Sequence, residues 1–321
     1  MKPWKSVMLS NLFPKEKQLI EFNKGLEIKY ENIPRKLFKY QSFNKFSKKN
    51  LLDNVIWLEY PEKFNDPYDC ALTYSTKDLS NHFVIEEIEK MLSTIPLGKY
   101  APTIEEKKQI VGSEDKYLSL FEVIVKKEDS ISIETREQLL EAIRTYLNKR
   151  PTPFSNIDKV TKGVLIASCF SEVNNSIKMW SHYADCHKGF CLEYDFKSLP
   201  YTDLRTRLLF PIIYQSELFD VTEYLKNAKK ENFNPFFAVR AAITKSIEWK
   251  YEKEWRLILP FGVSNETREM TVPSPKAIYA GSKINSSNKA FLNIYSKSKN
   301  IPLYQSTMSK NEFKVKFERE L

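Results

Sequence analysis

The chain has 321 residues, of which 42% are hydrophobic and 28% are charged, so it can bury a sizeable core and is not an intrinsically disordered chain. Its net charge of +9 permits an anionic partner such as a nucleic acid or a nucleotide. The lysines are scattered along the chain, however, and scattered lysines more often serve solubility. Its seven glycines form no phosphate-binding loop of the P-loop or dinucleotide-binding type. No apolar run is long enough for a membrane span and no signal-peptide core is recognisable, so we expect a cytoplasmic protein without a membrane partner.

Two strands and a helix are predicted in the first part of the chain. The segment 36–43 has the composition of a short strand, and 44–54 is typical of a helix that ends at Asn54. A second strand is expected over 55–60, and a polar turn over 61–70 follows it. Up to this point the chain is therefore expected to be strand-rich.

The middle of the chain has a different pattern. The segments 75–95, 103–127 and 132–150 carry apolar residues at helical spacing, with capping residues ahead of them. We therefore predict a helical insertion over 77–160, within a single domain that spans residues 1–321.

Strands return after the insertion. A helix is expected to start at Ser176 and to end before Gly189, and two further helices are expected between about 216 and 246. The predicted strands are 164–171, 190–196, 207–214, 254–260, 277–281, 302–306 and 313–317. Because helices and strands do not alternate regularly, the fold class is expected to be α+β, with a mixed, mainly antiparallel sheet.

The segment KMWSHYADCHKGFCLEYD, residues 178–195, concentrates two of the three histidines and two of the four cysteines. His182, Cys186, His187 and Cys191 are superficially similar to zinc ligands, but the spacing is a poor match to paired ligands in turns, and we expect no metal. The four cysteines of the chain, Cys70, Cys169, Cys186 and Cys191, are too few and too irregularly spaced for a disulfide framework, which indicates reduced thiols.

On a helix, Met179, His182, Tyr183 and Cys186 would share one side. Such a face can line a pocket, or it can contain a core histidine whose hydrogen bonds are satisfied. We expect the helix to line a cleft, with His182 and Tyr183 pointing into it.

A second group of ionisable residues lies in KSIEWKYEKEWRLILP, residues 245–260. In an extended chain, Glu252, Glu254 and Arg256 would project from one face. That face is either a solvated edge or the polar wall of a cleft, and the flanking aromatic residues favour the cleft.

The turn that contains Asn65, Asp66, Pro67 and Asp69 carries a third group of polar side chains. Asn and Asp stabilise turns by accepting hydrogen bonds from backbone amides, and Pro sets the bend. The two aspartates could also bind a metal or a ribose, so both interpretations stay open here.

Four motifs in this order resemble the bacterial domain of unknown function 2971 family: LFKYQSF, FNDPYDC, SCFSEVNNSIKMWSHYADCHKGFCLEYDF and WKYEKEWRL. The resemblance covers about residues 36–285. The first motif of that family usually has Arg before Tyr, where this chain has Lys39 and Tyr40, and Cys186 stands where such sequences tend to have other polar residues.

The order of motifs is also similar, more distantly, to the ADP-ribosyltransferase-like fold. That similarity implies NAD as a substrate. It implies Glu254, His182 and Tyr183 as catalytic residues, and Lys39, Tyr40, Ser168, Ser171 and Trp180 as substrate-binding residues. From the polar groups described above, we also expect Glu252 to be catalytic and Asn65, Asp66, Asp69 and Arg256 to bind the substrate. A carboxylate such as Glu254 would stabilise the positive charge that develops on the ribose, and Lys39 would meet the diphosphate, though less well than Arg.

Three functions follow as hypotheses. The first is an NAD-dependent ADP-ribosyltransferase-like enzyme, such as a toxin or phage-defence effector, with a protein or nucleic acid as acceptor. The second is a non-catalytic sensor that binds a nucleotide or a protein, and an ion pair between Glu254 and Arg256 would favour it. The third is a metal-dependent hydrolase or nuclease built on His182 and the carboxylates Asp66, Asp69, Glu252 and Glu254.

Overall fold

The structure is a computed structural model that describes residues 2–94, 98–149, 154–228, 231, 233–260 and 268–320. Its contacts divide the chain into two compact units. One, here called the sheet unit, consists of residues 1–72, 158–219 and 234–321. The other, the helical unit, consists of residues 73–157 and 220–233. The single domain with an insertion over 77–160 stays a prediction.

An eight-stranded sheet organises the sheet unit, with the strand order β14-β13-β12-β5-β1-β4-β10-β6. β12 and β13 run parallel, whereas all other neighbours in this sheet run antiparallel. The strands are β1 (Leu37–Gln41), β4 (Leu165–Ser171), β5 (Phe190–Tyr194), β6 (Leu209–Pro211), β10 (Glu254–Pro260), β12 (Ala277–Ala280), β13 (Leu303–Met308) and β14 (Val315–Arg319). The predicted mixed, mainly antiparallel sheet is thus confirmed, and the ADP-ribosyltransferase-like assignment stays a prediction.

Short strands lie outside this sheet. β2 pairs antiparallel with β11, and β7 pairs parallel with β9. The bounds of these strands and of two more are β2 (Val55–Trp57), β3 (Leu72–Thr73), β7 (Ile213–Gln215), β8 (Phe219–Asp220), β9 (Thr244–Ser246) and β11 (Glu269–Thr271).

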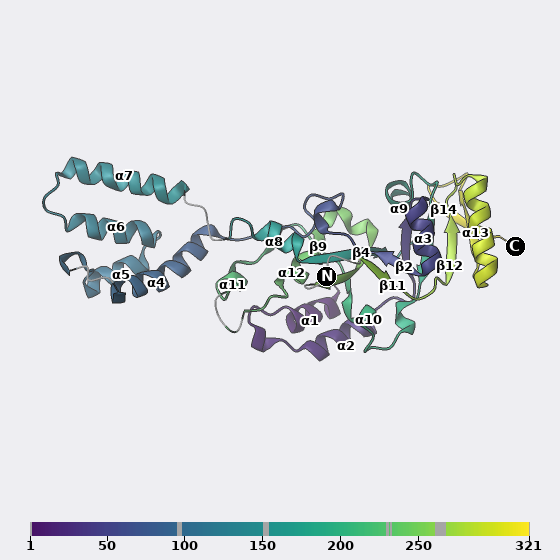
Figure 1. The fold of residues 1–321 in the computed structure, drawn as a ribbon, viewed down its shortest axis with the longest axis horizontal. Coiled ribbons are helices and arrows are strands. Elements are labelled where there is room, and N and C mark those ends of the chain that lie inside the picture. Colours follow the sequence, from purple (N-terminus) through teal and green to yellow (C-terminus); the bar gives the residue numbers. More distant parts are fainter. Residues whose placement is uncertain are drawn as a thin grey trace. The chain divides into compact units, whose positions relative to one another are not determined.

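Several helices of the sheet unit pack beside the sheet (Figure 1). The helices of this unit are α1 (Pro3–Leu12), α2 (Phe22–Glu31), α3 (Lys45–Asp53), α8 (Ile157–Gly163, whose first residue belongs to the helical unit), α9 (Ile177–Tyr183), α10 (Leu204–Leu208), α12 (Phe237–Ala242) and α13 (Ser286–Lys299). Short 3₁₀ helices are η1 (Lys17–Leu19), η2 (Pro61–Lys63), η4 (Phe196–Ser198) and η5 (Ile247–Glu252). The main core, which includes Leu37, Ile166, Leu192 and Leu257, contains residues from the central strands, and it fixes their register.

Local sequence explains where several of these helices begin and end. Asn44 caps α3 by accepting hydrogen bonds from the backbone amides of Phe46 and Ser47, and Asn54 ends it in a left-handed conformation. Ser176 caps α9 in the same way, through the amide of Met179. The predicted ends at Asn54 and Ser176 are therefore confirmed.

Several predicted elements are wrong in extent; the strand expected over 55–60, for example, ends at Trp57. α9 ends at Tyr183, well before Gly189, because Asp185, Cys186 and His187 all adopt left-handed backbone conformations that no right-handed helix can contain. The predicted strand 207–214 is divided between α10, β6 and β7. Pro211, which has no N–H to donate, ends β6, and the chain then joins β9 in a different sheet.

The helical unit contains α4 (Thr76–Thr94), η3 (Gly98–Tyr100), α5 (Ile104–Gly112), α6 (Lys116–Lys126), α7 (Ile133–Lys149) and α11 (Thr222–Leu225). α6 packs against α4, α5 and α7 (Figure 1). A small core of Val84, Ile110, Leu120 and Val123 holds this unit together. Among the described residues, no helix is both long and apolar enough to cross a membrane.

Candidate functional site

A cavity of about 540 Å³ opens beside the central strands of the sheet unit. Its size is in the range of small-molecule sites. It is lined by Phe38, Lys39, Tyr40, Trp57, Glu59, Lys63, Phe64, Asn65, Asp69, Ala167, Ser168, Cys169, Phe170, Ser171, Met179, His182, Tyr183, Lys245, Glu252, Glu254 and Arg256. Eleven of the thirteen predicted site residues are thus brought together at one cavity.

Lys39 lies on β1, between strands β4 and β5, and is half-buried. Its Nζ donates to Ser168 Oγ at 2.7 Å and to the carbonyl oxygen of Cys169 at 3.2 Å, and lies 5.2 Å from the ring centre of Phe170. Burial lowers the pKa of Lys39 below its ordinary value. Within the described part of the chain, Lys39 forms no ion pair with a carboxylate, so its charge is available to an anion.

Arg256 lies on β10 and is fully buried. Its Nε donates to Glu254 Oε1 at 2.5 Å, and its Nη2 donates to Asp69 Oδ1 at 2.6 Å and to Glu254 Oε2 at 3.1 Å. Its Nη1 donates to the carbonyl oxygen of Ala242 at 2.9 Å. The guanidinium group is therefore surrounded by acceptors of the protein itself, and it joins β10 to the turn that carries Asp69.

Lys245, on β9, completes the same cluster. Its Nζ lies 2.6 Å from Glu252 Oε2, 3.0 Å from Glu254 Oε2 and 3.8 Å from Asp69 Oδ2. Two cations and three carboxylates are therefore buried together. We call Asp69, Lys245, Glu252, Glu254 and Arg256 the ion cluster.

The carboxylates of the ion cluster differ in their electrostatics. Burial alone would raise the pKa of Glu254, but Arg256 and Lys245 outweigh burial and hold this pKa well below its ordinary value. Burial, together with the charge of Glu254, raises the pKa of Glu252. Burial also raises the pKa of Asp69, against the effect of Arg256. Glu254 is thus the firmly ionised member of the cluster.

Glu252 connects the ion cluster to α9. Tyr183 donates its hydroxyl hydrogen to Glu252 Oε1 at 2.6 Å, and Asn65 Nδ2 lies 3.4 Å from the same hydroxyl oxygen. Burial and the nearby Glu252 raise the pKa of Tyr183. The exposed His182 also lines the cavity.

The expectation that Glu252, Glu254 and Arg256 share one strand face is wrong in one respect. Glu252 ends the 3₁₀ helix η5, and Lys253 adopts a left-handed conformation before β10 begins at Glu254. The three side chains meet because Lys245 bridges the two glutamates, rather than through strand alternation.

Two lining residues use their polar atoms within the fold. Ser171 Oγ donates to the carbonyl oxygen of Glu252 at 2.6 Å and accepts from the amide of Val173 at 3.1 Å. The hydroxyl of Tyr40 donates to the carbonyl oxygen of Val173 at 2.9 Å. These contacts hold β1 and β4 in place beside η5.

Trp180 and Asp66, two of the predicted substrate-binding residues, do not line the cavity. Trp180 is fully buried; its Nε1 donates to the carbonyl oxygen of Asn174 at 2.6 Å, and its ring contacts Tyr40 edge-on. Asp66 Oδ1 accepts from the amide of Tyr68 at 2.9 Å, as expected of a turn residue. Both positions serve the local structure that surrounds the site.

The four residues considered as zinc ligands lie in different surroundings. Cys186 is exposed and Cys191 is fully buried in β5. His187 is buried and stacks on Trp180. In the ranges that the structure describes, no group of three or more His, Cys, Asp or Glu side chains is arranged to hold a metal ion.

Several lining residues were not predicted from the sequence: Trp57, Glu59, Lys63, Phe64 and Lys245. Lys245 is the most consequential, because it pairs with both glutamates. A signal for it exists, since it directly follows the largely apolar run AVRAAIT, in which Arg240 is the single charge. Such a lysine must either reach solvent or find an acid.

One comparison with known proteins supports the resemblance drawn from the motifs. Residues 179–257 match the family model described as "Protein of unknown function (DUF2971)". The match extends from α9 into β10, so it includes His182, Tyr183 and every member of the ion cluster except Asp69. None of the curated proteins and none of the solved structures compared with the chain matches it.

Proposed function

We propose that the cavity of the sheet unit binds a nucleotide-type anion, such as NAD or ADP-ribose, with a phosphate group at Lys39. The observation that carries this proposal is the difference between the half-buried Lys39 and the two buried cations of the cavity, Lys245 and Arg256. Lys245 and Arg256 are paired with carboxylates, whereas Lys39 has only the neutral acceptors Ser168 and Cys169. A phosphate group at Lys39 would form a charge-assisted hydrogen bond and would compensate the burial of the ammonium group.

The aromatic residues of the lining support a ligand that also carries a flat ring. Two aromatic rings lie at the cavity wall: Trp57, which is exposed, and Phe64, which is half-buried. Aromatic rings in such positions can stack on a nicotinamide or an adenine. Asn65 and Tyr183 supply polar groups for the hydroxyls of a ribose.

The contacts of Glu254 favour a site that binds the nucleotide without using Glu254 for catalysis. Arg256 occupies both oxygens of Glu254, and Lys245 adds a third contact. A carboxylate held this way has little capacity left for a ribose hydroxyl. The carboxylates of the ion cluster likewise already hold cations of the protein, so the nuclease hypothesis gains no support from them.

NAD glycosyl transfer is the second candidate, and the contact between Tyr183 and Glu252 favours it. Glu252 has one cationic partner, Lys245, and its other oxygen accepts from the phenol of Tyr183. A ribose hydroxyl that replaced the phenol would meet a carboxylate, as the stabilisation of an oxocarbenium-like transition state requires. In that case Glu252, rather than Glu254, would be the working carboxylate. The role of a toxin or phage-defence effector stays a prediction.

The test is calorimetric titration of ADP-ribose and of NAD into the full chain and into Lys39→Gln. We expect Lys39→Gln to weaken ADP-ribose binding by about tenfold or more, since it removes a charge-assisted contact. Lys17→Gln, which removes one charge from an exposed position outside the cavity, is the matched control and should bind like wild type. Absence of binding to the wild type, or equal effects of both variants, would refute the proposal.

Mass analysis for nicotinamide after incubation with NAD decides between binding and turnover. Nicotinamide release that is lost in Glu252→Gln supports the second candidate. Binding of NAD without any release supports a sensor. Release that is lost only in Glu254→Gln contradicts the assignment of Glu252.

A further inference from the structure

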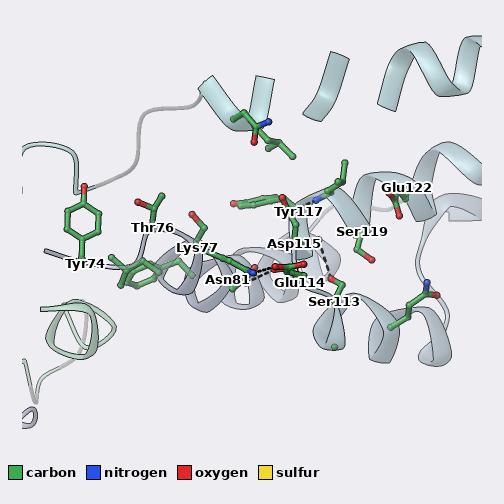
Figure 2. Close-up of a pocket in the computed structure, with 18 of the residues that line it drawn as sticks. Tyr74, Thr76, Lys77, Asn81, Ser113, Glu114, Asp115, Tyr117, Ser119 and Glu122 are labelled. Carbon is green, nitrogen blue, oxygen red and sulfur yellow. Dashed lines mark hydrogen bonds and ion pairs between the residues drawn. The ribbon is translucent and has the colours of Figure 1, made fainter. Parts of the chain in front are cut away.

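The helical unit contains a cavity of its own, with a volume of about 980 Å³ (Figure 2). Residues of α4, α5, α6 and α7 line it, together with the turn between α5 and α6. α6 packs against both α4 and α7, and residues of all three helices line the cavity. The cavity lies entirely within residues 74–154.

Part of the cavity wall is apolar. Its larger hydrophobic side chains are Leu79, Phe83, Tyr117, Leu118, Leu147 and Phe154. Leu147 comes from α7, a helix in which no described residue is buried, although Leu139, Leu140, Ile143, Tyr146 and Leu147 are apolar. Tyr146 is 68% exposed and Leu139 is 42% exposed. The apolar side of α7 is thus only partly covered by α6.

The polar part of the wall is acidic. Glu114, Asp115 and Glu122 line the cavity, against the single cation Lys77 (Figure 2). Lys77 pairs with Glu114, and Asp115 caps α6 through the amide of Leu118. Glu122 is half-buried and forms no hydrogen bond or ion pair with the described residues. Its charge is therefore available to a cation.

Ser119 adds a second polar group to this part of the cavity wall. It is only 7% exposed, lines the cavity from α6, and its Oγ has no hydrogen-bond partner among the described residues. Its Oγ is not among the described buried side-chain atoms that lack a partner, so it is open to the cavity, where a donor group of a ligand can take the place of water. It lies one helical turn from Glu122, so one ligand group can reach both side chains.

We propose that this cavity is a docking site for a basic amphipathic helix of a protein partner. The apolar side of the partner helix would pack on Phe83, Leu118 and Leu147 and continue onto the exposed apolar side of α7. A lysine or arginine of the partner would reach Glu122 and Ser119. This is binding of a helix in a groove, in which apolar anchors supply most of the affinity and charge selects the partner.

A defined peptide tests the proposal on the full chain. The probe is a fluorescein-labelled peptide of about 18 residues, roughly five helical turns, built of Leu on one face and Lys on the other. Binding is measured by fluorescence anisotropy. A peptide with the same composition in scrambled order, which has no apolar face, and one with Glu in place of Lys are the controls. We expect binding of the Leu/Lys peptide, and of neither control.

Matched variants locate the site. Glu122→Lys should weaken binding of the peptide about tenfold, because it replaces attraction by repulsion within the cavity. Glu137→Lys, on α7 outside the cavity lining, makes the same change in net charge and should alter affinity by less than about twofold. The isosteric Glu122→Gln removes the charge with minimal disturbance of folding and should weaken binding by roughly threefold.

Three results would overturn the proposal. The first is no binding of the Leu/Lys peptide, and the second is equal weakening by the two lysine variants, which would indicate non-specific charge attraction. The third is binding of the small aromatic cation N-methylquinolinium in a Glu122-dependent manner while the peptide does not bind, which would assign the cavity to a small molecule. Because the ligand and the variants differ from those used for the sheet unit, failure here leaves the proposed nucleotide site unaffected.

Discussion

The ion cluster and Lys39 line the same cavity, yet they use charge in opposite ways. Arg256 and Lys245 lie within hydrogen-bonding distance of carboxylates that the chain itself supplies. Lys39 meets a serine hydroxyl and a backbone carbonyl. The comparison teaches that Arg256 and Lys245 use their charge within the fold, whereas the charge of Lys39 is not paired with a carboxylate among the described residues, which is the basis of the proposed anion site.

Loss of the central cation of the ion cluster should have the largest effect. Arg256→Met would leave Asp69 and Glu254 buried without their main partner. We expect it to lower the free energy of unfolding by about 3–5 kcal/mol. Urea denaturation followed by circular dichroism measures this. A loss below about 1 kcal/mol would mean that the carboxylates protonate or reach water at little cost, and that the cluster is not a structural unit.

Replacement of Glu254 and replacement of Glu252 should change the free energy of unfolding by different amounts and with different pH dependence. Glu254→Gln should cost about 2–3 kcal/mol at pH 7, whereas Glu252→Gln should change the free energy of unfolding by less than about 1 kcal/mol, because burial and Glu254 disfavour the ionised form of Glu252 in the fold. The pKa of Glu254 is lower in the folded state, so its stabilisation is complete above the unfolded value near 4.5 and is lost as the pH falls below it. The raised pKa of Glu252 has the opposite sign, so its contribution is lost as the pH rises through the folded value.

Urea midpoints measured between about pH 3 and pH 7 test this difference. Glu254→Gln should flatten the loss of stability on acidification, and Glu252→Gln should not. If both variants reduce the loss of stability at low pH equally, the two carboxylates do not differ in their folded-state pKa values, and the distinction drawn between them is incorrect.

Removing the charge at Lys39 should affect stability least. Lys39→Met is expected to change the free energy of unfolding by less than about 1 kcal/mol, and to raise it rather than lower it, because burial disfavours the ammonium group. Since the pKa of Lys39 is lowered in the folded state, the advantage of the variant should shrink as the pH rises towards 10.5. A substantial loss of stability in the same urea titration would show that Lys39 serves the fold as Arg256 does.

The part of the site that lies on strands could largely be predicted, because the direction of a side chain follows from its position along a strand. The strands that carry Lys39, Ser168 and Arg256 are short, strongly patterned segments, and their register in the sheet is fixed by burial. The pairing of Glu254 with Arg256 was expected as an alternative for the same reason, because residues two apart on a strand share a face.

The other parts of the site depend on backbone conformations that the amino-acid sequence does not predict. After α9, three successive residues adopt left-handed conformations although none is a glycine: Asp185, Cys186 and His187. Lys253 also adopts a left-handed conformation, directly before β10. The position of Lys245 depends on the parallel pairing of β9 with β7, two strands of three residues each. Strands so short leave almost no periodic signal, and their pairing is decided by tertiary contacts.

The sheet order has a consequence for how the chain reaches its native state. β1 is made early, but its partners β4 and β5 follow only after most of the helical unit, and β10 comes later still. Such distant pairings slow folding because the loop-closure entropy is lost before the contacts form. On the ribosome, the cavity with Lys39 therefore exists only once β10 has emerged, whereas α5, α6 and α7, being neighbours in sequence, can associate long before.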